Sequence, residues 1–62
     1  MTVGDMLDTF KQIQFVIFNR VSDNAVMSCN RDEIGEEERK YELNNARFSD
    51  YLGRLTLETD VK

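Results

Sequence analysis

The 62-residue sequence contains no histidine, no proline and no tryptophan, and its single cysteine is Cys29. One cysteine excludes a disulfide within the chain and fits a reducing, intracellular setting. Because histidine is missing and only one thiol is present, the ligands that zinc prefers are lacking, so we expect no metal site and no cofactor. A nucleophile activated by an imidazole base is excluded as well. Cys29 is expected to pack as a small apolar residue, and the protein is predicted not to be an enzyme.

Charge and hydropathy restrict the partners. Twelve acidic residues against eight basic ones give a net charge of −4, whereas a nucleic-acid-binding surface is normally basic. The longest apolar run, Phe15–Phe18, has four residues, which is too short to span a membrane. The opening residues, MTVGDMLDTF, lack the basic start and long apolar run of a secretory signal. We therefore expect a cytoplasmic protein that binds neither nucleic acid nor membranes.

A helix is predicted from Thr2 to about Lys11. The apolar residues that recur at helical spacing are Val3, Met6, Leu7 and Phe10. Thr2 can cap this helix, and Asp5, three residues on, completes a shortened capping box. One apolar face is therefore available to cover a sheet.

Two pairs of strands are predicted around this helix. Ile13 to about Val21 and Ala25 to Asn30 form the first pair, and Ala46 to Tyr51 and Arg54 to Val61 form a hairpin about Leu52-Gly53. The last strand alternates apolar and polar residues, as an antiparallel strand with one buried face does. The prediction is one α+β domain over residues 1–62, with the order α-β-β-(α)-β-β. A small antiparallel sheet of three to four strands would carry the N-terminal helix on one face.

The polar middle of the chain allows two interpretations. A helix over about Glu33 to Leu43 would be anchored by Ile34 and Tyr41, although Gly35 weakens it. Alternatively, KYEL (residues 40–43) is a strand that leads into the next one. The sequence leaves this choice open.

Strand QFVIFN raises a question because it is apolar on both faces, with Phe15 and Ile17 on one and Val16 and Phe18 on the other. The helix can cover only one face. Either the strand is central and loops cover its second face, or a second copy of the chain does. We predict a homodimer with Val16 and Phe18 at its interface, since a chain this short gains little net stability from its own core.

Five of the twelve acidic residues lie within seven positions. They are Asp32, Glu33, Glu36, Glu37 and Glu38. Such a cluster either keeps a small protein soluble or docks on a basic surface of a partner. We predict these five residues, with the aromatic residues Phe48 and Tyr51, as partner-binding residues.

The layout of the whole chain resembles that of small accessory proteins of phages and prophages, particularly from Gram-positive hosts. The resemblance rests on the amphipathic TVGDMLDTF, the strand QFVIFN, a polar middle ending in LNNARF, and the closing RLTLETDV. It implies an inhibitor of a host defence protein in the bacterial host cytoplasm. Together with the predicted dimer and the acidic cluster, it leads us to expect a homodimeric anti-defence inhibitor whose acidic surface binds a basic surface of a host protein. The alternatives are an assembly protein that only self-associates, and a small nucleic-acid-binding protein that uses Arg47 and Arg54 beside the two aromatic residues.

Overall fold

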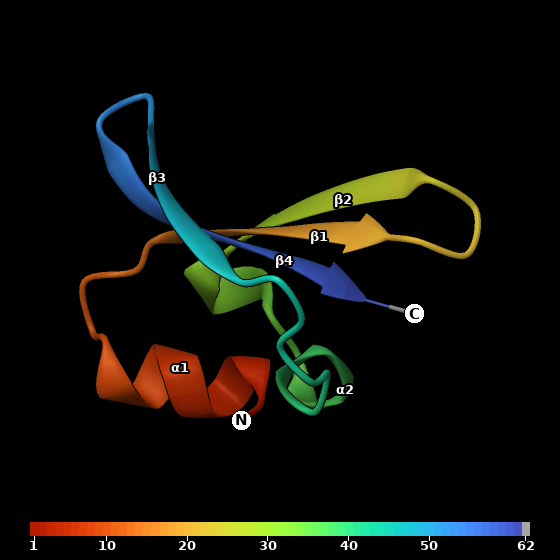
Figure 1. The fold of residues 1–62 in the computed structure, drawn as a ribbon. Helices are drawn as coiled ribbons and strands as arrows, with labels where there is room; N and C mark the ends of the chain where they lie inside the picture. Colours follow the sequence, from red (N-terminus) through yellow and green to blue (C-terminus); the bar gives the residue numbers. More distant parts are fainter. Residues whose placement is uncertain (62) are drawn as a thin grey trace.

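The computed structural model describes residues 1–61, which form one sheet with all helical segments on one side of it (Figure 1). The elements in chain order are α1 (Val3–Thr9), β1 (Phe15–Arg20), β2 (Ala25–Asn30), the 3-10 turn η1 (Arg31–Glu33), α2 (Glu36–Arg39), β3 (Arg47–Tyr51) and β4 (Arg54–Val61). The predicted α+β class, the N-terminal helix and the order of the elements are confirmed.

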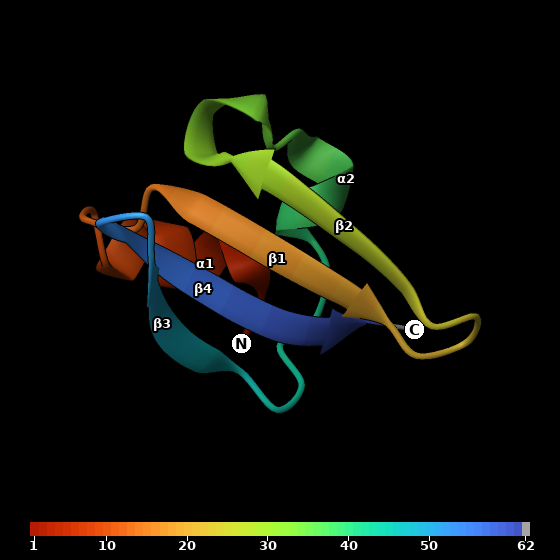
Figure 2. The ribbon, with the colours of Figure 1, turned by 90° about the horizontal axis from the view of Figure 1, so that it is seen from above.

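The four strands lie in the order β2-β1-β4-β3, so β1 and β4 are central (Figure 2). The pairs β1–β2 and β3–β4 are antiparallel, as predicted, whereas β1 and β4 run parallel. The sheet is therefore mixed rather than wholly antiparallel. Alternation of side chains within a strand reports which face is buried but not the direction of a neighbour distant in sequence, so the sequence did not reveal the parallel pair.

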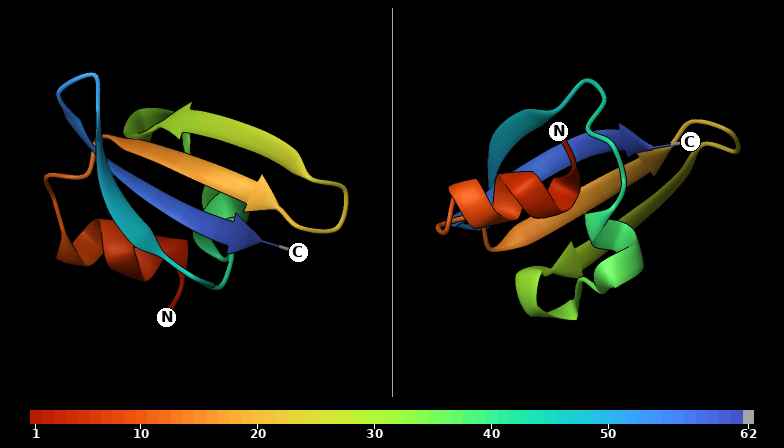
Figure 3. Two further views of the ribbon diagram at one scale, coloured as in Figure 1. Left: turned by 45° about the horizontal axis from the view of Figure 1, so that its top comes forward. Right: turned by 90° about the horizontal axis from the view of Figure 1, so that it is seen from below.

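α1 begins with the capping box that its sequence predicts. Thr2 Oγ1 accepts a hydrogen bond from the Asp5 N–H at 3.2 Å, and Asp5 Oδ2 accepts one from the Thr2 N–H at 3.1 Å. Gly4 allows α2 to approach closely, because a Cβ at this position would lie 3.1 Å from both Cβ and the carbonyl oxygen of Arg39. Seen from below, α1 covers the middle of the sheet and α2 lies on the β2 side (Figure 3).

The core lies between these helices and the sheet. Its buried apolar residues are Val3, Leu7, Ile13, Val16, Phe18, Leu57 and Val61. Val16 and Phe18 are fully buried within a single chain, and Phe18 also packs edge-to-face on Tyr41 with ring centroids 5.6 Å apart. Our placement of Val16 and Phe18 at a dimer interface is therefore wrong, because their face of β1 is the one that α1 covers.

The middle of the chain follows neither interpretation fully. α2 has only four residues and begins after Gly35, whose backbone is extended. Residues 40–43 form no strand, although Glu42 makes an isolated bridge with Thr2 and the Tyr41 carbonyl accepts the Val3 N–H at 2.9 Å. The anchoring is as expected, since Ile34, Tyr41 and Leu43 all pack against the core.

The β3–β4 hairpin turns where the sequence places it. Leu52 and Gly53 both have positive φ, of 54° and 76°, which is the backbone of a tight two-residue hairpin turn. Glycine adopts this conformation without strain, whereas leucine does so at a cost. Leu52 is also 77% exposed, so its side chain contributes little to the core.

Candidate protein-binding surfaces

The acidic segment, residues 32–38, runs from the second residue of η1 through the link to the third residue of α2. Glu33 and Glu38 shape it, because Glu33 Oε1 accepts the Asn30 N–H at 3.0 Å and Glu38 Oε1 accepts the Gly35 N–H at 2.9 Å. The carboxylates of the other three acidic residues of the segment have no such local role. These exposed residues are Asp32, Glu36 and Glu37.

The two arginines beside the acidic segment point away from it. Arg31 donates to the main-chain carbonyls at the end of α1 and the loop after it. The acceptors are the carbonyl oxygens of Leu7, Phe10, Lys11 and Ile13, the last at 2.8 Å. This position suits a guanidinium, since the C-terminal end of a helix attracts positive charge.

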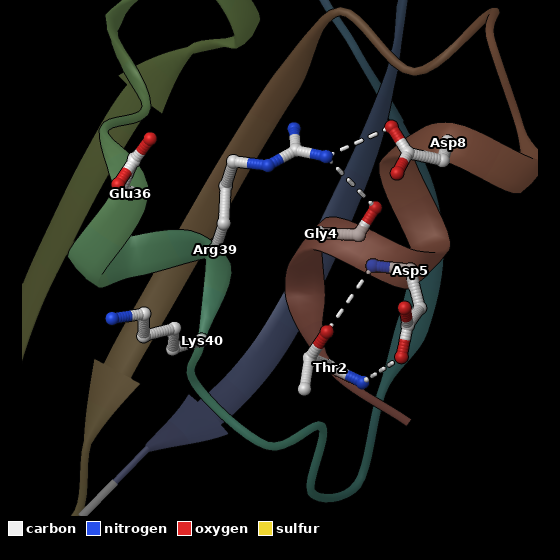
Figure 4. Close-up of a pocket in the computed structure, with 7 residues that line it drawn as sticks. All are labelled: Thr2, Gly4, Asp5, Asp8, Glu36, Arg39 and Lys40. Carbon is white, nitrogen blue, oxygen red and sulfur yellow. Dashed lines mark hydrogen bonds and ion pairs between the residues drawn. The ribbon is translucent and has the colours of Figure 1, made fainter.

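Arg39 reaches from α2 across to α1. Its Nη2 lies 2.8 Å from Asp8 Oδ1 and donates to the Gly4 carbonyl at 3.4 Å (Figure 4). The groove that it crosses has Asp5 and Asp8 on the α1 side and Glu36 on the α2 side. Among residues 1–61, no ion pair includes a carboxylate of the acidic segment. The carboxylates of the segment are therefore not paired directly with the arginines next to it in sequence.

The face of the sheet opposite the helices carries an aromatic cluster. Phe15 and Tyr51 are stacked with ring centroids 6.1 Å apart, and the Arg54 guanidinium lies 5.3 Å from the centre of the Phe15 ring. β1 is central, as one of our interpretations proposed, but side chains of β3 and β4 rather than loops shelter its second face. Sequence reasoning missed Phe15 as part of this cluster, although the apolar residues on both faces of β1 were the signal.

The predicted aromatic contact residues do not share a surface. Phe48 packs edge-to-face on Phe10 on the helix side, with centroids 5.5 Å apart, whereas Tyr51 lies on the opposite face with Phe15. Both remain about half exposed, at 48% and 50%. β3 and α2 also lie at opposite edges of the sheet (Figure 2). The acidic segment, Phe48 and Tyr51 therefore occupy three separate places.

The arginine pair considered for nucleic-acid binding is largely engaged within the chain. Arg47 Nη2 lies 3.1 Å from Glu58 Oε2 and 3.8 Å from Asp60 Oδ1. A hydrogen bond from Asn19 and the contact with Arg47 lower the pKa of Glu58, so this carboxylate stays ionised beside the arginine. Two acidic groups thus accompany the basic residues of this face, which suits phosphate poorly.

Cys29 lies half-buried on β2. Burial raises the pKa of its thiol, and Glu33 and Glu38 raise it further. A thiol of this kind stays protonated at neutral pH and is a weak nucleophile.

Comparison with protein-family models, with curated proteins and with solved structures finds no match for this chain. Within residues 1–61, no helix has the length and apolar character that a membrane crossing requires. The same residues include no cluster of three or more potential metal-binding side chains.

Proposed function

We propose that this chain is a small non-catalytic protein-binding module that inhibits a host protein in the bacterial cytoplasm, as some phage proteins of this size do. The acidic segment is its contact surface, and the partner presents a basic groove. The observation that carries this proposal is the orientation of Arg31 and Arg39, which turn onto α1 and leave Asp32, Glu36 and Glu37 exposed.

Such a surface would act mainly through long-range electrostatics. A net charge of −4 on a chain of this size attracts a basic partner and accelerates encounter, and both the rate and the affinity should fall as salt is added. The raised pKa of Cys29 favours a structural role for the only thiol, in keeping with a protein that binds rather than catalyses.

The test uses two charge-matched double variants. Glu36→Gln with Glu37→Gln removes exposed charge from the acidic segment but keeps Glu33 and Glu38, whose carboxylates cap local N–H groups. The control, Glu42→Gln with Asp50→Asn, removes the same charge from exposed residues outside the segment. Each tagged protein is used to capture partners from an extract of a Gram-positive bacterium, and the affinity of any stoichiometric partner is then measured at low and high salt.

We expect the wild type and the control to retain the same partner, and the acidic-segment variant to lose it or to bind about tenfold more weakly at low salt. Equal binding by all three proteins would show that the acidic segment is not the contact surface. Failure of the wild type to retain any partner would contradict the proposed function itself. A chain that retains only further copies of itself would instead be an assembly protein.

A further inference from the structure

β2 is an edge strand that nothing in the described chain pairs on its outer side. It stands first in the order β2-β1-β4-β3, and α2 lies in the layer below the sheet rather than beside the strand (Figure 1). Val26 is 67% exposed and Met27 36%, and Ser28 is exposed as well. The centre of this edge is therefore open to another strand.

The hydrogen bonds of β1 show which main-chain groups of β2 point outward. In an antiparallel pair, alternate residues direct both their N–H and their C=O to the partner strand. Val21 N–H donates to Val61 O of β4, so the preceding residue, Arg20, faces β2, where it is in register with Ala25. Every second residue of β2 therefore directs its main-chain N–H and C=O toward β1, beginning with Ala25 and continuing with Met27 and Cys29. The main-chain groups of the residues between them point outward, and these residues are Val26, Ser28 and Asn30.

One outward group is already satisfied. The Asn30 N–H is bonded by Glu33 Oε1 at 3.0 Å, which agrees with its assignment to the outer side. At the other end, Asn24 has a φ of 58° and lies in the turn, where a strand cannot continue. The free pairing groups of this edge are thus those of Val26 and Ser28.

β2 lacks the devices by which edge strands normally avoid pairing with other chains. Its sequence, AVMSCN, contains no charged residue and no proline, in a chain that is 32% charged. The opposite edge, β3, has the sequence RFSDY and carries both Arg47 and Asp50. Of the two edges, β2 is the one without charges that would oppose the approach of a second strand.

We propose that β2 pairs antiparallel with β2 of a second copy, about a two-fold axis at Met27. In this register Val26 lies opposite Ser28 of the second copy, and the two residues exchange main-chain hydrogen bonds in both directions. Met27 then meets its own counterpart. An axis at Val26 would place Ser28 opposite Asn24 of the second copy, which lies in the turn. An axis at Ser28 would place Val26 opposite Asn30 of the second copy, whose N–H is already bonded to Glu33. The proposal therefore fixes a register as well as an edge, and it does not rest on the acidic segment.

The register is tested with opposite charges at the axis. Met27→Glu and Met27→Lys each place two like charges face to face, whereas a mixture of the two variants places opposite charges there. By analytical ultracentrifugation up to millimolar concentration, we expect the wild type to dimerise and each variant to be monomeric. The mixture should form a dimer that contains one copy of each variant. Circular dichroism is used to check that both variants fold. We expect them to fold, because Met27 is exposed.

A second pair of variants tests the edge independently of the register. Ser28→Pro removes an outward N–H and leaves the β1–β2 hydrogen bonds intact, so it should weaken the dimer by about tenfold or more. Asp50→Pro makes the same kind of change on the β3 edge and should leave the dimer unchanged. A wild type that stays monomeric throughout would overturn the proposal, as would a dimer that Ser28→Pro does not weaken. A mixture of the Met27 variants that stays monomeric would overturn the axis.

Discussion

The strongest test of the structure concerns Arg31. Its guanidinium holds four carbonyl groups at the end of α1 and the following loop, and two of these bonds, to Leu7 and Ile13, are partly buried. Replacement by methionine keeps an apolar stem but removes the guanidinium that donates to these carbonyls. Hydrogen bonds from a charged group contribute about 1.5–3 kcal/mol each, so losing the two partly buried bonds should lower the free energy of unfolding by at least about 3 kcal/mol, the sum at the lower end of that range.

A loss of that size is large for so short a chain. At about 0.05–0.15 kcal/mol per residue, the total free energy of unfolding is roughly 3–9 kcal/mol. The unfolding entropy of about 2.1 cal/mol/K per residue converts the loss into a decrease in Tm of about 20 °C. Arg31→Lys should recover only part of it, because one ammonium cannot reproduce the planar fork of donors.

Urea denaturation followed by circular dichroism measures these differences. Arg20→Met is the matched control, because Arg20 forms an exposed ion pair with Asp23 at 3.4 Å, and pairs of this kind contribute less than about 1 kcal/mol. If Arg31→Met were as stable as this control, the inward position of Arg31 would be refuted. The argument that the acidic segment is left without its neighbouring arginine would then fail with it.

Two further predictions concern α1 and the hairpin. The hydrogen bonds from the Thr2 main chain and side chain lower the pKa of Asp5 below 3.8, so Asp5 stabilises the fold above that pH and ceases to do so as the pH falls through the lowered pKa. The stability difference between wild type and Asp5→Ala, from urea denaturation, should therefore shrink below pH 3.8, and a difference that is constant with pH would contradict the capping role. Leu52→Asn should stabilise the protein by about 0.5–1 kcal/mol, since asparagine tolerates positive φ better than leucine, and a lower urea midpoint would contradict the left-handed turn.

Local patterns predicted the local structure well. The apolar spacing in residues 3–10 and the Thr2–Asp5 pair gave α1 and its cap, and the hairpin about Leu52-Gly53 lies where it was expected. The second helix was predicted too long. The helix begins only after Gly35, and it ends before Tyr41, whose carbonyl accepts a hydrogen bond from the Val3 N–H of α1. No local sequence pattern predicts such a contact between distant segments.

The covered face of β1 could not be predicted for a related reason. Both faces of the strand are apolar, so alternation did not distinguish Val16 and Phe18 from Phe15 and Ile17. Contacts between distant segments decide which face α1 covers, since Val16 aligns with Leu57 of β4 and both share the core with Leu7 of α1. The same lack of long-range information explains the predicted site, in which residues that lie apart were treated as one surface.

The acidic segment and the β2 edge should respond to salt in opposite directions. Binding of a basic partner is an attraction between unlike charges, so screening weakens it. Pairing of two copies brings together chains of net charge −4 each, and the acidic segment directly follows β2, so screening reduces a repulsion and strengthens the dimer. Main-chain hydrogen bonds and the Met27 contact, which carry the dimer, depend little on salt. Dimer and partner affinities that fall together as salt rises would mean that charge attraction drives the self-association as well, and the uncharged β2 edge could not then be its interface.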